Sequence, residues 1–223
     1  MSDLGEEVDR FWNHPDFPEI FKTYLRHNHS VIRATVPLLK TAAESCKSPQ
    51  YSKDPVAQGM IHYLEQHAIE ETGHDEWILD DAEVMGMDRQ HLLNFEPSQV
   101  ASHIVGSQYY WILHHHPVSM LGYIAVMEGY PSSPEFFKSV AIRNKLPEKA
   151  VSSFVYHSKI DPVHKNDLDN LIDGLPLEEK HMSWMGLSAL RTIQYLTELL
   201  RMTNNSALNQ IQQQNQSELV TGS

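Results

Sequence analysis

The sequence predicts an all-α fold, a single bundle of about seven helices. Apolar residues recur at steps of three and four over most of the chain, which is the spacing of one helix face. No segment alternates apolar and polar residues as a strand does. A chain of 223 residues with 41% hydrophobic content can bury one substantial core. We therefore predict one domain over residues 1–204, followed by a polar flexible tail over residues 205–223.

Each predicted helix has a local pattern of its own. The apolar spacing and the capping residues predict helices over residues 17–46, 54–85, 98–116, 118–129, 135–144, 147–174 and 176–202. Pro37 is expected to kink the first helix, and Asp54 and Gly86 are expected to begin and end the second. Residues 87–97 are predicted to form a loop. From Thr203 onward the chain is rich in Gln, Asn and Ser, so a frayed end is expected.

Composition and charge argue against several classes of protein. The formal net charge is −12, from 17 basic and 29 acidic side chains, which argues against a nucleic-acid partner. No apolar run approaches the roughly 20 residues that span a bilayer, so no membrane partner is expected. Cys46 is the single cysteine and no signal peptide opens the chain, which indicates a reducing, cytoplasmic location. The 14 histidines are many for this length and indicate a use for imidazole.

The second predicted helix carries the densest polar motif. His67, Glu70, Glu71 and His74 stand at i, i+3, i+4 and i+7, so two imidazoles and two carboxylates project from one helix face. Imidazole and carboxylate together are ligands of non-heme iron and manganese. A solvated charged face is the alternative interpretation. Apolar residues flank the motif on both sides, which favours a polar patch within a buried helix.

Two further elements add possible ligands. His157, Asp161 and His164 stand at i, i+4 and i+7 of a later helix, with Pro162 between them. Either the proline bends this helix, or the helix begins there and Asp161 is only its cap. Glu128 ends an otherwise apolar stretch, where a carboxylate is costly to bury unless it is paired or binds a metal. It could also lie exposed in the following turn.

Taken together, three helices offer the six or seven nitrogen and oxygen ligands that two metal ions need. Helical bundles build such sites in their cores. The ferritin-like pattern requires two Glu-x-x-His helices, whereas this chain has one clear example, Glu71 to His74. A ferritin fold is therefore disfavoured.

The chain resembles the heme-oxygenase-like diiron oxidases and oxygenases, built on the scaffold shared with heme oxygenase and thiaminase-like and PQQ-synthase-like proteins. The resemblance rests on His74, on Glu128, and on the order His157-x3-Asp161-x2-His164, and it covers roughly residues 15–200. It implies a heme-oxygenase-like bundle and these metal ligands: His67, Glu71, His74, Glu128, His157, Asp161 and His164. Many members carry a glutamate where this chain has His67. The missing carboxylate is therefore expected from Glu71 or from Glu70.

The resemblance also implies an activity. It implies two Fe(II) ions, dioxygen as co-substrate, and oxidation of a small amino-acid-like amine with carbon–carbon cleavage. The segment Glu70–Trp77 and the Gln-rich tail are similar to members that convert a brominated tryptophan to an indole-3-carbonitrile in natural-product biosynthesis. Bundles of this kind commonly form homodimers, so a homodimer is expected.

Three other functions stay open at this stage. A heme-binding protein on the same scaffold would need one proximal histidine, for which His27 or His29 could serve. A non-catalytic metal-binding protein would use the same ligands. A thiaminase-like hydrolase would need an activated thiol, but Cys46 lies at a helix end in a Lys-Ser-Pro segment.

Overall fold

The protein is built from α-helices and two 3-10 turns, with no strand, over residues 2–221, the part of the chain that the computed structural model describes. Side chains are described for residues 3–206. The all-α prediction is confirmed. In chain order the elements are α1 (Ser2–Trp12), α2 (Phe17–Ile32), α3 (Thr35–Lys47), η1 (Pro49–Tyr51), α4 (Pro55–Glu70), α5 (His74–Val84), α6 (Arg89–Leu93), α7 (Gln99–His114), α8 (Ser119–Glu128), α9 (Pro134–Arg143), η2 (Glu148–Val151), α10 (Ser152–Gly174) and α11 (Glu179–Thr221).

Several predicted helix ends are confirmed because local caps set them. Asp54 precedes α4 and accepts hydrogen bonds from the backbone N–H groups of Val56 and Ala57 at 2.9 and 3.0 Å. Ser98 caps α7 in the same way through Ala101. Gly86 follows α5 with a φ of 76°, a conformation that favours glycine at a helix end.

The first two predicted helices are each divided in two. The first breaks at Arg33 and Ala34 rather than bending at Pro37, which lies in the first turn of α3, where its missing N–H costs nothing. The second breaks after Glu70, and Gly73 adopts a φ of 92° before α5 begins. A continuous helix over residues 54–85 was therefore a wrong prediction.

Two short helices were not predicted. The predicted loop over residues 87–97 contains α6, which Asp88 caps through the backbone N–H of His91. Helix α1 precedes the first predicted helix and buries Phe11 against Phe17. Together with the two divisions, these helices explain why the bundle contains more elements than the predicted seven.

The last helix is longer than predicted. Its end was expected at Met202, but α11 continues to Thr221. Thr203 and Asn204 are buried, and the Asn204 side chain donates to the backbone carbonyl and to the carboxylate of Glu7 in α1. These contacts to the opposite end of the chain hold the start of the polar segment against the bundle. The division into a domain at 1–204 and a flexible tail stays a prediction, and residues 222–223 lie outside the described part.

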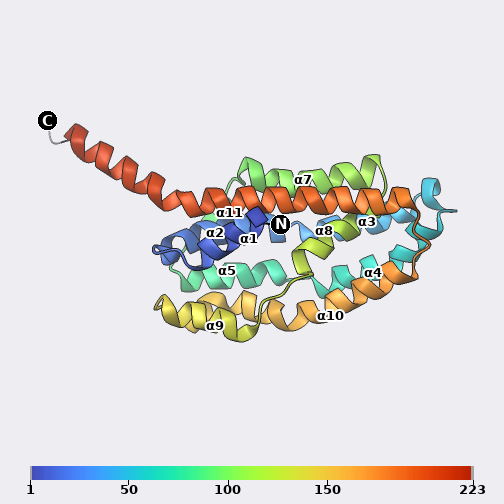
Figure 1. Cartoon of the computed structure of the whole chain (residues 1–223), viewed down its shortest axis with the longest axis horizontal. Coiled ribbons are helices and arrows are strands. Elements are labelled where there is room, and N and C mark those ends of the chain that lie inside the picture. The colour runs from blue at the N-terminus through green and yellow to red at the C-terminus, as the bar shows by residue number, and fades with distance from the viewer. Residues whose placement is uncertain (1, 222–223) are drawn as a thin grey trace.

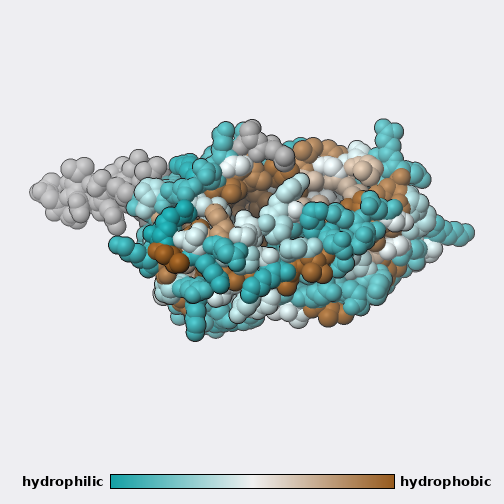
Figure 2. Space-filling model, turned by 60° about the horizontal axis from the view of Figure 1, so that its bottom comes forward, coloured by the Kyte–Doolittle hydropathy of each residue, from teal (hydrophilic) through white to brown (hydrophobic). Residues whose placement is uncertain are grey.

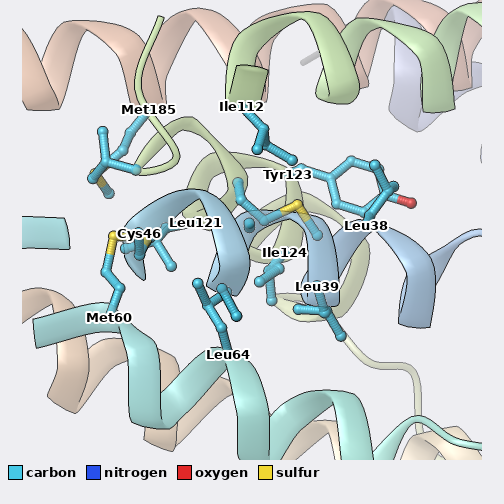
Figure 3. Packing of buried hydrophobic residues seen from close by; sticks show 14 of the residues in the cluster. Leu38, Leu39, Cys46, Met60, Leu64, Ile112, Leu121, Tyr123, Ile124 and Met185 are labelled. Carbon is cyan, nitrogen blue, oxygen red and sulfur yellow. The ribbon is translucent and has the colours of Figure 1, made fainter. Parts of the chain in front are cut away.

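The helices lie roughly along one long axis, with α7 and α11 on one side of the bundle and α4, α5 and α10 on the other (Figure 1). The core between them contains Leu38, Leu39, Leu64 and Tyr123, which belong to one cluster of buried side chains from α3, α4 and α8 (Figure 3). Gly122 lets α8 approach α11 closely, since an added Cβ would lie 2.1 Å from the Met185 carbonyl oxygen. This packing places the end of α8 between the two sides of the bundle.

One face of the molecule is mostly polar and has a hydrophobic hollow. On the face shown in Figure 2, hydrophilic residues cover most of the area, and hydrophobic residues gather around a hollow near its middle. Among the described residues, no helix combines the length and the apolar character needed to cross a bilayer.

Candidate metal centre

The turn between α4 and α5 determines where the second-helix motif points. Glu71, Thr72 and Gly73 form a tight turn in which the His74 N–H donates to the Glu71 carbonyl oxygen at 3.3 Å. Glu71 is buried in this turn, and His67 and His74 flank it at the end of α4 and at the start of α5. The motif therefore converges through a break in the helix rather than along one continuous face.

One group of side chains joins three helices. His67 from α4, Glu71 from the turn, Glu128 from α8 and His164 from α10 each offer an atom within 4.8 Å of the others. His67 Nε2 lies 3.0 Å from Glu128 Oε1, and His164 Nδ1 lies 3.4 Å from Glu128 Oε2. His164 Nδ1 also lies 3.6 Å from Glu71 Oε1. Two imidazoles and two carboxylates thus face one another in the core.

A second group shares one carboxylate with the first. Glu71, His74 and His157 offer atoms within 4.8 Å of one another. Glu71 Oε2 lies 3.1 Å from His74 Nδ1, while Glu71 Oε1 faces the first group. Glu71 is therefore placed between the two groups, as a bridging carboxylate would be.

Helix α10 is fixed to α5 by a buried carboxylate. Asp81 in α5 accepts from the backbone N–H of Ser153 at 3.1 Å and from its hydroxyl. Ser153 in turn offers its carbonyl oxygen to His157 Nδ1 at 2.9 Å. Because a carbonyl only accepts, His157 Nδ1 carries the ring proton, and Nε2 is left with a free lone pair. This is the form of histidine that binds a metal.

Asp161 belongs to neither group of converging atoms. It lies on the same side of α10 as His157 and His164, is buried, and has no hydrogen-bond partner for Oδ1 among the described residues. Pro162 lies inside α10, which runs without interruption from Ser152 to Gly174. The interpretation of Asp161 as the cap of a helix beginning there is therefore wrong, and its role as a ligand stays a prediction.

The two neighbouring glutamates have different positions. Glu71 is buried between the groups, whereas the Glu70 side chain is 50% exposed and lies on their outer side. Glu70 Oε2 is 3.8 Å from His67 Nδ1 and 3.6 Å from His164 Nε2, the ring nitrogens that face away from Glu128. Glu71 is thus the candidate ligand, and Glu70 can orient two histidines from outside.

Electrostatics couple these side chains strongly. Burial opposes the charged form of each group, but the contacts with Glu128 raise the pKa of His67 and of His164. The same contacts hold the pKa of Glu128 at about 2. Burial, together with the Glu128 charge, raises the pKa of Asp161 to about 7. Protons on histidine thus balance buried carboxylates here, and a bound cation could replace them.

A cavity of about 580 Å³ opens beside both groups. Its polar end contains Glu71, Glu128, His157 and Asp161. Its walls are mostly apolar and come from α1, α2, α5, α8, α9, α10 and α11. They include the aromatic rings of Trp12, Tyr24, Tyr123, Phe137 and Phe154. No Lys or Arg occurs among the described residues that line it. An apolar molecule with one polar group would fit such a cavity.

Unpaired buried atoms show that these residues fit a metal. His74 Nδ1, His164 Nδ1 and Glu128 Oε2 have no hydrogen-bond partner among the described side chains, although carboxylate and imidazole atoms lie close to each. Buried polar atoms in proteins are almost always hydrogen-bonded, so atoms that converge without bonding call for an ion. Imidazole and carboxylate suit iron, manganese or zinc.

Comparison with known families identifies the scaffold. The sequence matches the family model of iron-containing redox enzymes over residues 23–196. The chain belongs to this family. No curated protein matches the sequence. For this iron-containing redox enzyme, the polar end of the cavity is the place where the side chains could hold iron.

Solved structures show the fold. A domain of unknown function with a heme oxygenase-like fold from Shewanella denitrificans superposes with a TM-score of 0.76 at 16% identity, covering 100% of this chain and 90% of that chain. A TenA homolog from Pseudomonas syringae pv. tomato gives a TM-score of 0.67 at 10% identity, covering 91% and 89%. The iron-containing redox enzyme therefore has a heme oxygenase-like fold, as the resemblance implied.

A third histidine cluster of this enzyme was not predicted from the sequence. Asp54, His116 and His181 offer atoms within 4.8 Å of one another, and both histidines are buried. The Nδ1 atoms of His116 and His181 accept from the backbone N–H groups of Val118 and Glu178, each at 3.0 Å. Both rings therefore carry their proton on Nε2, the nitrogen that would have to bind a metal. This cluster is a poor metal site and joins α4, α8 and α11.

Other residues considered from the sequence lie away from the cavity. Cys46 is buried in the core, and burial raises the pKa of its thiol to about 12, which disfavours a nucleophilic thiolate. His27 and His29 are buried in α2 and are not among the described residues that line the cavity. A proximal heme ligand at either position gains no support from this geometry.

Proposed function

We propose that this iron-containing redox enzyme is a non-heme diiron oxidase or oxygenase that uses dioxygen to oxidise an amine. One observation carries the proposal: two groups of converging imidazole and carboxylate atoms share Glu71 at the polar end of an apolar cavity. Each group could hold one iron. Asp161 would complete the ligand set from the neighbouring turn of α10.

The cavity supports an aromatic amine as the substrate. Aromatic walls favour a flat ring, and the only charged groups among its described lining residues are the acidic and histidine side chains at the polar end. A substrate amine would therefore be drawn toward that end. A substrate carboxylate would find no Lys or Arg among the described lining residues, so a bound metal would be its partner. Conversion of a brominated tryptophan to an indole-3-carbonitrile, with carbon–carbon cleavage, is the most specific form of the proposal.

The residues have separate roles in this reaction. When bound, iron would supply the electron-transfer chemistry that activates dioxygen. His67, Glu71, Glu128 and His164 would hold one ion, and Glu71, His74 and His157 the other. The apolar walls exclude water from the polar end. The Asp81–Ser153 contact keeps His157 in the tautomer whose Nε2 is free.

Two other properties belong to this proposal. We propose that the enzyme works as a homodimer in the cytoplasm, and that its partners are small molecules rather than nucleic acids. A non-catalytic metal-binding protein is the second candidate, because the same ligands would serve it. It would bind iron without consuming dioxygen in the presence of an amine.

Anaerobic titration of metal-free protein with Fe(II) tests the proposal. We expect two irons per chain, and a transient visible absorption after oxygen is added. His157→Ala should bind less iron and lose the absorption, whereas His181→Gln, a buried histidine of the third cluster, should behave as wild type. Oxygen uptake is then measured with a panel of amines that begins with tryptophan derivatives. No iron uptake, or uptake indifferent to His157, would overturn the proposal.

A further inference from the structure

A chain of aromatic rings leads from the candidate ligands to the surface. The Trp77 indole stacks on the His74 ring with centroids 3.9 Å apart and planes 24° apart, and it lies 5.4 Å from the His157 ring. On its other side the Tyr156 ring is 5.2 Å away, and the Tyr156 side chain is 49% exposed. Histidine, indole and phenol therefore form one continuous path outward from the second group.

This path differs from the other aromatic contact at the site. Tyr63 stacks on His67 with centroids 5.4 Å apart, but its hydroxyl is buried and has no hydrogen-bond partner among the described residues. A phenol that loses an electron must also lose its proton, and the Tyr63 hydroxyl has nowhere to release one. The Tyr156 ring reaches solvent, which can take the proton. Indole and phenol are also the side chains that lose a single electron most readily.

We propose that Trp77 and Tyr156 form a relay that carries single electrons from an external donor to the metal centre. The inference rests on the proposed function. Each dioxygen reduced to water takes four electrons, and a dioxygen that is used for a single two-electron oxidation step of the amine receives only two of them from the substrate. The remaining electrons must come from outside, and the relay gives them a route that does not pass through the substrate cavity.

Each transfer of an electron along the relay is accompanied by the release or uptake of a proton. Trp77 gives one electron to the metal centre and releases its indole proton. Tyr156 then gives an electron to the Trp77 radical, which regains a proton from solvent, while the Tyr156 phenol releases its own. A one-electron donor such as ascorbate returns an electron and a proton to Tyr156. The net change is one electron moved from ascorbate to the metal centre. The Lys159 ammonium lies 5.9 Å from the Tyr156 ring centroid and would attract an anionic donor.

Freeze-quench electron paramagnetic resonance tests the relay. Protein loaded anaerobically with Fe(II) is mixed with oxygen in the absence of substrate, and the organic radical signal is recorded. We expect a transient aromatic radical that Trp77→Phe abolishes and that Tyr156→Phe makes longer-lived. Reduction of the oxidised iron by ascorbate, followed by visible absorption, should become several-fold slower in both variants. Trp77→Phe keeps a ring against His74, and Tyr156→Phe alters only a half-exposed side chain, so both variants should fold.

Matched controls separate the relay from general effects. Tyr63→Phe removes a phenol that also stacks on a candidate ligand, and Trp111→Phe removes an indole on α7. Both should leave the radical and the ascorbate rate unchanged. Iron per chain and oxygen uptake are measured in every sample. Wild type that binds two irons and consumes oxygen, with a radical and an ascorbate rate indifferent to Trp77, would overturn the relay alone. Wild type that binds no iron would overturn the proposed function and the relay together.

Discussion

Two buried histidine clusters of this protein have similar composition and opposite chemistry. At the candidate metal centre, His164 Nδ1 and His74 Nδ1 face carboxylates without forming hydrogen bonds. In the cluster of Asp54, His116 and His181, both Nδ1 atoms accept from backbone N–H groups, and the unpaired atom is the protonated Nε2 of His181, a donor that cannot bind a metal. The first cluster borders a cavity, and the second fills a junction between helices.

The position of the ring proton distinguishes the candidate metal centre from the structural cluster. An imidazole whose Nδ1 accepts a hydrogen bond must carry its proton on Nε2, so that Nε2 donates, as His116 does to Asp54 at 3.1 Å. An imidazole whose Nδ1 donates, as His157 does to Ser153, leaves Nε2 free for a metal. The pKa directions do not follow this division: burial lowers the pKa of His157 as it lowers that of His116, whereas His67 and His164, which contact Glu128, have a raised pKa.

The sharpest test of this comparison removes one carboxylate from each cluster. Glu71→Ala takes a candidate ligand from both metal groups, so we expect iron affinity to fall more than the roughly 10–100-fold typical of an outer carboxylate. Asp54→Asn should leave iron binding unchanged. Equilibrium titration with Fe(II) under argon measures both. An equal loss of iron affinity in the two variants would contradict the assignment of the metal site to the Glu71 groups.

Loss of the outer carboxylate should have a smaller effect. Glu70→Gln keeps the shape of the side chain but weakens its hold on the outer nitrogens of His67 and His164. We expect iron affinity to fall by about 10–100-fold, with the number of irons per chain unchanged at saturation. Glu65→Gln, a change on the exposed side of α4, is the control. A Glu70 variant that binds as tightly as wild type would contradict the orienting role.

The structural cluster should show its effect in stability instead. Asp54→Ala removes the cap of α4 and the acceptor for His116, so the free energy of unfolding should fall by about 0.5–2 kcal/mol. Urea unfolding of metal-free protein measures this loss. Asp54→Asn, which can still cap, should lose less. An Asp54→Ala variant as stable as wild type would show that the cluster does not join these helices.

The smallest expected effect concerns pH. Burial lowers the pKa of His116 in the folded protein below the value of about 6.5 that is usual for histidine, so the unfolded chain binds this proton first as pH falls. The free energy of unfolding should therefore decrease on acidification below about pH 6.5, by at most about 1.4 kcal/mol per pH unit for one proton. His116→Gln should have a shallower decrease between pH 7 and 5 in urea titrations. Parallel curves would show that His116 does not set this dependence.

Much of the fold follows from local signals. Asp54 and Ser98 cap helices through hydrogen bonds to residues two or three positions away, so the sequence alone predicts them. The continuation of α11 beyond Met202 does not follow from local signals. Asn204 is held there by Glu7, which lies at the other end of the chain. The break at Gly73 also escaped prediction, since a single glycine within a helical pattern does not by itself choose a positive φ.

The ligand candidates could be named from the sequence, because the residue types and their spacing are local properties, whereas the break in the chain between α4 and α5 could not. The sequence placed His67, Glu71, Glu128, His157 and His164 in one constellation, and the structure brings these side chains together. The burial of Glu71, the exposed position of Glu70 and the Asp54–His116–His181 cluster came from the tertiary structure alone. Those outcomes depend on which backbone groups approach each side chain across the bundle, and no spacing along the chain encodes that approach.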